Sequence, residues 1–189
     1  MADKNLALGV AKLVDELRKR GVHPSDADLN RLATHIANGF EVRQEEVAIL
    51  RLSADSQMLS FVIPLKLSRI GAIPITTANS LAVKTIRDKR GEIVNNFTAY
   101  KHPTVFEAVD LSHEEKALPI RKIMSSPMLA EGEIAGVIQI SRKARPGELA
   151  GADFTQADLA ELNAVGSILG KYLSEWPAPS SLRKVPAKT

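Results

Sequence analysis

The sequence has no cysteine among its 189 residues. Without a thiol, the chain cannot form a disulfide, bind a metal through thiolates or use a cysteine nucleophile. It also lacks any apolar run near the ~20 residues that cross a bilayer, and its first residues lack the basic and then apolar layout of a signal peptide. These absences predict a soluble, cytoplasmic protein that does not enter a membrane.

Aromatic residues make up only 4% of the chain, which is little for stacking on nucleic-acid bases. The net charge is +3, but the 25 Lys and Arg are interspersed with 22 Asp and Glu, as on a solvated surface of mixed charge. The first two expected helices are separated by a break that contains Pro24, and neither has a clustered basic face. Nucleic acid is therefore not an expected partner.

Catalytic and metal-binding motifs are also missing. The sequence has neither a Gly-x-Ser-x-Gly elbow nor a glycine-rich phosphate loop before a helix. None of the four histidines lies four residues from another, which is the helical spacing of paired metal ligands. The run His113-Glu114-Glu115 is typical of a solvated helix start. We therefore predict neither an enzyme nor a metal site.

Hydrophobic periodicity indicates a mixture of helices and strands. Apolar residues at helical spacing predict helices over 6–17, 29–40, 80–88 and 159–173. Residues that favour strands, separated by turn signals, predict strands over 46–52, 58–63, about 71–73, 92–95, 118–130 and 134–141. This order predicts an α+β fold, in which helices from the chain ends cover one face of an antiparallel sheet. Residues 96–119 form the least regular segment.

The start of the last helix is specified in detail. Thr155 is a good N-cap, and Asp158, three residues later, completes a capping box. Phe154 just before the cap and Leu159 just inside the helix form a hydrophobic-staple pair. These residues predict a well-defined helix start.

The same helix has a broad apolar surface that contains small residues. Because glycine costs ~1 kcal/mol relative to alanine inside a helix, Gly166 and Gly170 predict the close approach of a neighbouring backbone. We expect this helix to contact the sheet on one side and helices on another, including those of a second copy of the chain. The residues expected at this dimer contact are Leu6, Leu13, Leu162, Gly166, Leu169 and Gly170.

The order and spacing of several segments resemble GAF domains. Residues 128–140 (MLAEGEIAGVIQI), a variable loop, and then the Phe154-Thr155 start of the last helix are similar to the carboxy-terminal half of that family. Residues 80–82 and 91–99 are similar to its middle helix and the following strand. The resemblance extends from about residue 27 to residue 173. It implies a PAS-related antiparallel sheet with terminal helices on one face and a ligand pocket on the other, and a role as small-molecule sensor and dimerisation module.

Members of the family that bind cyclic nucleotides carry an Asn-Lys, Phe, Asp-Glu signature. Here Arg142-Lys143 stands in place of the first pair, Phe154 matches, and Asp158-Leu159 replaces the last pair. This pattern allows an ion pair between Lys143 and Asp158, but the capping box and the staple account for these helix-start residues without a nucleotide. Cyclic nucleotide is therefore not an expected ligand. Thiol-linked bilin and thiol-dependent sulfoxide reduction are excluded by the lack of cysteine.

By the same resemblance, the irregular segment forms the roof of the pocket. Its aromatic side chains would exclude water, and nearby polar groups would orient a ligand. The alternative is that the aromatic side chains fill the sheet face themselves. The predicted ligand-binding residues are Asn95, Asn96, Tyr100, His102, Phe106 and Arg121.

These observations divide the chain into an N-terminal helix and linker (1–24), a GAF-like domain (25–173) and a mobile tail (174–189). The leading hypothesis is a sensory, regulatory domain in signal transduction, which binds a small molecule and acts on a separate output protein through its terminal helices. The alternative is a homodimerisation or protein-interaction module of the same fold without a ligand. No cofactor is identified by the sequence.

Overall fold

The computed structural model describes residues 5–21, 23–68, 71–97 and 118–175. Most of the elements expected from periodicity are present within a few residues of their predicted bounds, and the short helix α3 is an addition. The elements in chain order are α1 (Leu6–Arg20), α2 (Asp26–Gly39), the 3-10 turn η1 (Gln44–Glu46), β1 (Val47–Leu52), β2 (Met58–Ile63), α3 (Leu65–Ser68), β3 (Ala72–Pro74), α4 (Leu81–Asp88), β4 (Glu92–Val94), β5 (Ile120–Ala130), β6 (Glu133–Lys143) and α5 (Gln156–Ser174).

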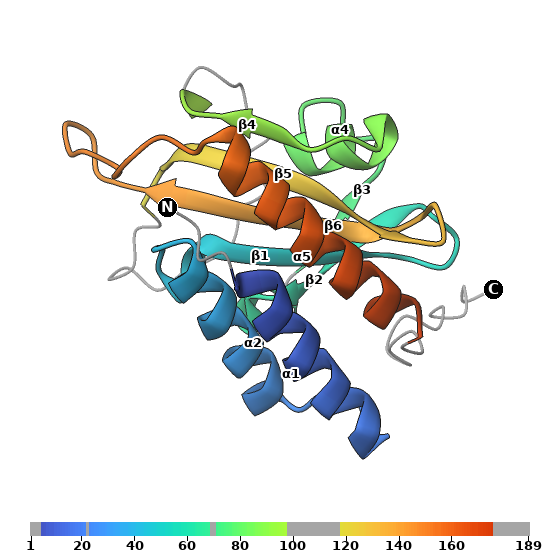
Figure 1. Ribbon diagram of the computed structural model, residues 1–189. Helices are drawn as coiled ribbons and strands as arrows, with labels where there is room; N and C mark the ends of the chain where they lie inside the picture. Colours follow the sequence, from blue (N-terminus) through green and yellow to red (C-terminus); the bar gives the residue numbers. More distant parts are fainter. Residues whose placement is uncertain (1–4, 22, 69–70, 98–117, 176–189) are drawn as a thin grey trace.

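Six strands form one antiparallel sheet in the order β3-β2-β1-β6-β5-β4. The helices α1, α2 and α5 cover one face of this sheet, which we name the helical face (Figure 1). The opposite face carries α4, and we name it the α4 face (Figure 1). The predicted α+β architecture, with helices from the chain ends on one face of an antiparallel sheet, is therefore confirmed.

Local sequence determines where the helices begin and end. α1 ends at Gly21 in the left-handed conformation (φ 62°), after three basic residues in its last turn, where cations interact favourably with the helix dipole. Capping boxes begin α2 at Ser25 with Asp28 and α5 at Thr155 with Asp158. The predicted start of the last helix is thus confirmed at residue resolution.

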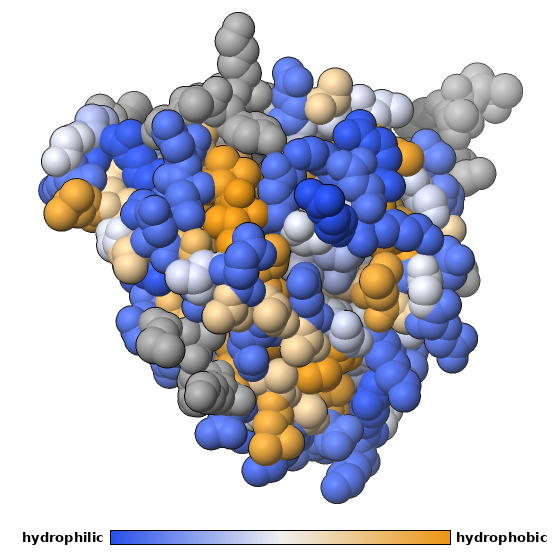
Figure 2. Space-filling model, turned by 45° about the horizontal axis from the view of Figure 1, so that its top comes forward, coloured by the Kyte–Doolittle hydropathy of each residue, from blue (hydrophilic) through white to orange (hydrophobic). Residues whose placement is uncertain are grey.

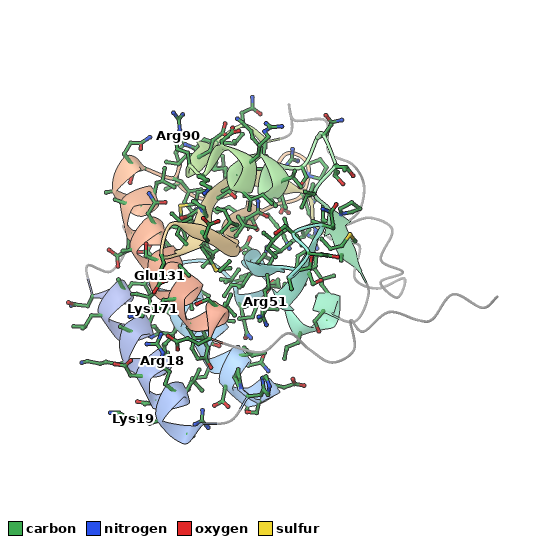
Figure 3. All side chains as sticks on the ribbon, turned by 90° about the vertical axis from the view of Figure 1, so that its right-hand side faces the viewer. Arg18, Lys19, Arg51, Arg90, Glu131 and Lys171 are labelled. Carbon is green, nitrogen blue, oxygen red and sulfur yellow. The ribbon has the colours of Figure 1, made fainter. Side chains whose placement is uncertain are left out.

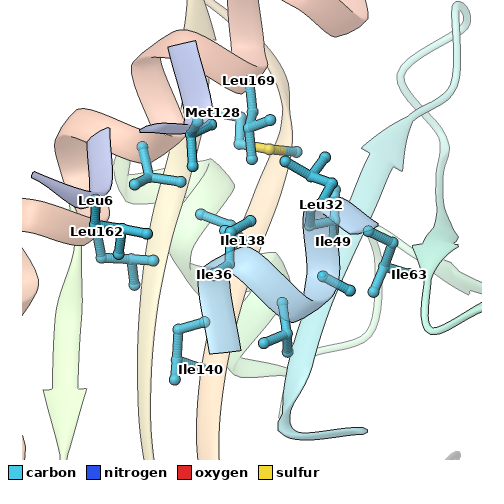
Figure 4. Close-up of a cluster of buried hydrophobic side chains, with 14 of the residues drawn as sticks. Leu6, Leu32, Ile36, Ile49, Ile63, Met128, Ile138, Ile140, Leu162 and Leu169 are labelled. Carbon is cyan, nitrogen blue, oxygen red and sulfur yellow. The ribbon is translucent and has the colours of Figure 1, made fainter. Parts of the chain in front are cut away.

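The main hydrophobic core lies between the helical face of the sheet and its three helices (Figure 4). Each large aliphatic side chain buried there contributes ~1.5–3 kcal/mol relative to an exposed one. α1 contributes to the same core as α2 and α5, so it packs as part of the folded unit. Side chains labelled in Figure 4 are Leu6, Leu32, Ile36, Ile49, Ile63, Met128, Ile138, Ile140, Leu162 and Leu169.

The face of the molecule in Figure 2 is mostly hydrophilic, with apolar patches among the hydrophilic side chains. Among the described residues, the large hydrophobic side chains that are exposed are Leu8 at 57% and Leu149 at 98%. Within the same part of the chain, no helix has both the length and the hydropathy to span a membrane.

Candidate functional site

The α4 face has two separate apolar clusters. α4 begins at Ser80, whose side chain accepts a hydrogen bond from the backbone N–H of Val83, and its apolar side chains contribute to both clusters. One cluster joins α4 to β1, β2, β3 and β6 and consists of Leu50, Leu59, Phe61, Ile73, Ala82, Val83 and Val137. The other joins α4 to β5 and the segment after β4 and consists of Leu81, Phe97 and Ile123.

A buried polar network joins α4 to β5 and β6. Thr85 Oγ1 lies 2.7 Å from Ser125 Oγ and 2.8 Å from the carbonyl oxygen of Leu81. Gln139 Nε2 donates to Ser125 Oγ at 3.1 Å. Thr85, Ser125 and Gln139 are 2%, 0% and 6% exposed. Burying a polar group costs free energy unless it is hydrogen-bonded, so three such groups bonded to one another beside two apolar clusters indicate a specific site.

The alternation of the strands puts Gln139 on this face. Along β6, Gln139 lies between Ile138 and Ile140, which are buried in the core of the helical face. Gln139 pairs with Ser125 of β5 on one side and with Ala48 of β1 on the other. Ala48 is only partly buried although β1 is an interior strand. Its side chain is a single methyl group, which takes up little room beside the carboxamide. We name Ala48, Thr85, Ser125 and Gln139 the Gln139 site.

None of these four residues is among those predicted from the sequence. A signal for Gln139 and Ser125 exists, because each is a polar residue at an inward position of a long apolar strand. Thr85 has a similar signal, since it shares the inward side of its helix with Leu81 and Ala82, but its partner lies 40 residues away in the chain and could not be predicted.

Two of the predicted ligand-binding residues bind backbone groups of the protein. Asn95 Nδ2 donates to the carbonyl oxygen of Phe154 at 3.0 Å, and Asn95 Oδ1 accepts from its N–H at 2.9 Å. Arg121 Nε donates to the carbonyl oxygen of Ala144 at 3.3 Å. A ligand role for both residues stays a prediction, as it does for Asn96. The other predicted residues, Tyr100, His102 and Phe106, lie outside the described part of the chain.

The ion pair that the sequence pattern allows between Lys143 and Asp158 does not form, and the preferred interpretation of the helix start as a capping box is confirmed. The Asp158 carboxylate accepts from the N–H and the hydroxyl of Thr155, both at 2.8 Å, as the capping box requires. Lys143 Nζ donates instead to the carbonyl oxygen of Glu45 at 3.0 Å. The physical reason is strand geometry: successive residues of β6 point to opposite faces, and Lys143 points away from the face that α5 covers.

Arg142, one residue earlier, faces α5 and the end of α2. Its guanidinium carbon lies 4.8 Å from the centre of the Phe154 ring, within the range of a cation–π interaction. Its Nη1 and Nη2 donate to the carbonyl oxygens of Glu41 and Phe40 at 3.1 and 3.2 Å. Phe154 and Leu159 are both buried in the main core, as the predicted hydrophobic staple requires. This region joins helices to the sheet.

Glu46, directly before β1, is a buried carboxylate that is 6% exposed. It accepts from the guanidinium of Arg43 at 2.9 Å, from the Arg43 N–H at 2.8 Å and from the Lys143 N–H at 2.5 Å. Burial alone would raise the pKa of Glu46, but the hydrogen bonds from Arg43 and Lys143 outweigh burial and hold the pKa below its ordinary value. For Lys143, burial lowers the pKa of the ammonium group. The Glu46 carboxylate therefore connects η1 to β6 through these hydrogen bonds.

The leucines predicted for a dimer contact are buried within one chain, apart from the partly buried Leu13. Leu6, Leu162 and Leu169 are 1%, 0% and 1% exposed. α1 lies beside α5 and runs parallel to it (Figure 3), since the Ala7 N–H donates to Glu161 at one end and Arg18 donates twice to Glu175 at the other. These leucines cannot contact a second copy, because α1, α5 and the sheet of the same chain already cover them. The homodimer itself stays a prediction.

Gly166 and Gly170 are also covered by the same chain. A Cβ atom on Gly166 would lie 2.9 Å from the carbonyl oxygen of Pro127, and one on Gly170 would lie 2.4 Å from that of Leu129. The predicted close approach of a neighbouring backbone is confirmed, and that backbone is β5. Both glycines are therefore corrected from dimer residues to internal contacts.

A cleft between α1 and α2 is too small for a ligand. It holds about 10 Å³ and is lined by Leu13, Leu17, Asp28, Arg31 and Leu32. This volume is at the lower limit for one water molecule. Over the described residues, no three His, Asp or Glu side chains come together as a metal site.

Comparisons with known proteins connect this geometry to solved structures. No protein-family model and no curated protein matches the sequence. The GAF domain of an Acinetobacter phosphoenolpyruvate-protein phosphotransferase matches with a TM-score of 0.63 at 13% identity, over 92% of this chain and 95% of that chain. A segment of a methyl-accepting chemotaxis protein matches with a TM-score of 0.59 at 17% identity, over 86% and 95% of the two chains.

An enzyme also shares the fold, which corrects one prediction. Free methionine-R-sulfoxide reductase from Neisseria meningitidis, in complex with its substrate, matches with a TM-score of 0.59 at 16% identity, over 92% of each chain. The prediction that this chain is not an enzyme is therefore wrong, because proteins with this architecture include catalysts. The chain has no cysteine, so any chemistry that it performs does not use a thiol of its own.

These solved structures agree with the architecture described above. They are similar to this chain over most of their length, in a sheet that carries terminal helices on one face. At identities of 13–17% the similarity concerns the fold alone. The chain has a GAF-like fold.

Proposed function

We propose that the protein is a sensory, regulatory domain that binds a small molecule on the α4 face, over the Gln139 site. The observation that carries this proposal is the buried polar network of Thr85, Ser125 and Gln139 on a face that also carries two apolar clusters. Ligand sites combine apolar walls with a few fixed polar groups in this way. Similarity to domains of a phosphotransferase and a chemotaxis protein supports a place in signal transduction.

A signal from this site would reach α5 through β5. Ser125 belongs to the polar network, and the next residue, Ser126, points to the other face, where its hydroxyl donates to Asn163 Oδ1 of α5 at 2.7 Å. α5 rests directly on β5 at Gly166 and Gly170. Because no flexible side chain separates the two backbones there, a displacement of β5 would be transmitted to α5. The proposal includes a separate output protein that reads the terminal helices in the cytoplasm.

A second candidate function is a homodimerisation or interaction module without a ligand. The observation that favours it is that Asn95 and Arg121, both predicted to bind a ligand, are engaged with backbone groups of the protein. In this alternative the α4 face serves only to complete the fold.

A screen of metabolites and cyclic nucleotides by thermal shift, followed by calorimetry, tests the leading proposal. A ligand at one hundred times its Kd adds about 2.7 kcal/mol of stability, which raises Tm by about 5–10 °C in a domain of this size. The variant Ala48→Leu places a larger side chain beside Gln139 and is expected to abolish binding. The matched control Ala160→Leu, on an exposed position of α5, is expected to bind normally.

Two results would count against the sensor. The first is that no compound raises Tm. The second is that the hits bind Ala48→Leu as well as they bind the wild type. Light scattering tests the homodimer form of the alternative, because a homodimerisation module forms a dimer at micromolar concentration without any ligand, whereas a monomer at high concentration would count against it.

A further inference from the structure

Of the two polar atoms of the Gln139 carboxamide, only the nitrogen makes a hydrogen bond within the described part of the chain. Its Nε2 donates to Ser125 Oγ at 3.1 Å, and within the described part of the chain no protein group hydrogen-bonds to its Oε1. The side chain is nevertheless 94% buried, with 6% of its surface exposed. In the described part of the chain, the fully buried side-chain atoms without a partner are His35 Nε2 and Arg142 Nε. Gln139 Oε1 is not one of them, so it keeps some contact with solvent and can accept from an occupant that donates to it.

The internal partners of Gln139 hold its carboxamide in one orientation. Ser125 Oγ accepts from Gln139 and is itself held by Thr85 Oγ1, which also contacts the carbonyl oxygen of Leu81 at 2.8 Å. A chain of hydrogen bonds therefore runs from the backbone of α4 to the amide of β6. With Nε2 directed at Ser125, Oε1 and the second Nε2 hydrogen remain for a ligand. The side chain offers one acceptor and one donor.

Among the described residues, the strand neighbours of Gln139 are uncharged, and Lys143, on the same face of β6, donates to the carbonyl oxygen of Glu45. Ala48 and Ser125 flank it on the neighbouring strands, and the two clusters of the α4 face are entirely apolar. The nearby acidic residue Glu46 is already neutralised by Arg43. An ionised ligand group would lose its hydration beside Gln139 without gaining a countercharge, which is unfavourable.

From this geometry we propose that the Gln139 site recognises a neutral ligand with a donor next to an acceptor, such as a cyclic amide, a ureide or the edge of a nucleobase. A planar group of this kind satisfies the free half of the carboxamide while its apolar surface contacts the side chains of the α4 face. The inference rests on the proposed small-molecule function and adds the chemical class of the ligand and the residue that selects it.

Titrations of the ¹⁵N-labelled full chain test the inference by NMR. The probes are uracil, hydantoin and adenine, with toluene as an apolar control and benzoate as an ionised control. Uracil, hydantoin or adenine is expected to shift the side-chain NH₂ resonances of Gln139 and the backbone amide of Ser125. This readout uses the wild-type protein and does not depend on the folding of a variant.

Two variants separate recognition from packing. Gln139→Met keeps the length of the side chain but has no donor and only a weak acceptor in its thioether, and it is expected to weaken binding about tenfold or more, as the loss of a hydrogen bond predicts. Gln156→Met makes the same change at an exposed position at the start of α5 and is expected to leave affinity unchanged.

The inference is overturned if none of the three donor–acceptor probes shifts Gln139, if only toluene or benzoate binds, or if Gln139→Met binds the probes as tightly as the wild type. The proposed function fails separately, when no compound of the metabolite screen binds the protein at all. A screening hit that is charged, or that is insensitive to Gln139→Met, would leave the sensor intact and refute the ligand class.

Discussion

At the scale of single residues, the buried acids and amides of this protein divide into those that the chain satisfies itself and those that it does not. Glu46 accepts three hydrogen bonds from Arg43 and Lys143, whereas the carboxamide of Gln139 makes one, to Ser125. The first arrangement stabilises the junction between η1 and β6. The second leaves Oε1 and one Nε2 hydrogen of Gln139 for a ligand, and a ligand site needs polar groups of this kind.

Replacing Glu46 by Gln is expected to lower the free energy of unfolding by about 2 kcal/mol at pH 7, because charged hydrogen bonds of this kind contribute about 1.5–3 kcal/mol. The folded-state pKa of Glu46 is lowered, so its contribution is present above the unfolded pKa of about 4.3 and is lost as the pH falls through the folded value. The difference between wild type and variant should therefore shrink on acidification. Urea denaturation at pH 7, 5 and 3.5 measures it.

Glu45→Gln is the control for this experiment. Glu45 forms an ion pair with Arg43 at 3.3 Å but is half-exposed, so its loss should cost about 0–1 kcal/mol. Equal effects of the two substitutions, or a difference for Glu46→Gln that grows at low pH, would contradict the structural role of the buried carboxylate.

At the scale of elements, the contact between α5 and β5 is unusually close. Gly166 and Gly170 have no Cβ atom, and this allows the backbone of α5 to lie directly on the backbone of β5. The same contact explains why the apolar surface of α5 is two-sided: one side meets the sheet and the other meets α1. A helix in this position is covered by its own chain.

Gly170→Ala is expected to destabilise the protein by about 2 kcal/mol. The new Cβ atom would lie 2.4 Å from the carbonyl oxygen of Leu129 and 2.6 Å from its nitrogen. Moving a backbone costs about 1–3 kcal/mol, which exceeds the gain of at most ~1 kcal/mol in helix propensity. Guanidinium denaturation gives the difference, with the exposed Ser167→Ala as a control that should change stability by less than about 0.5 kcal/mol. A Gly170→Ala protein more stable than wild type would refute the close contact.

At the scale of the whole molecule, the first helix and the last form one layer with α2 over the sheet (Figure 1). The predicted boundary at residue 25 separates α1 from the domain, but α1 buries Leu6, Val10, Val14 and Leu17 in the main core. Arg18 and Glu175 then join the ends of α1 and α5. The terminal helices therefore form part of the fold, and any output that they carry begins from a packed layer.

Two substitutions two residues apart on α1 test this integration. Leu6→Ala removes a side chain that is 1% exposed and should cost about 2–5 kcal/mol. Leu8→Ala removes one that is 57% exposed and should cost less than about 0.5 kcal/mol. Thermal unfolding followed by circular dichroism measures both. An unchanged Tm for Leu6→Ala would mean that α1 is a separate arm.

The sequence by itself determined the elements and their order, because period and capping depend on residues only a few positions apart. The capping boxes at Ser25 and Thr155, the staple at Phe154 and the close approach at Gly170 are examples of such local signals. The resemblance of residues 128–140 to GAF domains added the expectation of a GAF-like fold. The same resemblance also implied that polar residues near the irregular segment bind a ligand, and the structure shows that Asn95 binds the backbone of Phe154.

Only the tertiary structure decided which surfaces are covered and which polar groups meet. Thr85 reaches Ser125 across 40 residues of sequence, and Ala7 meets Glu161 across 154. The hydrophobic periodicity of a segment does not predict such pairings, since each depends on how helices lie on a sheet that is built from distant strands. The apolar stripe of α5 was readable from the sequence, but whether α1 or a second copy covers it was not, because burial is a property of the assembled layers.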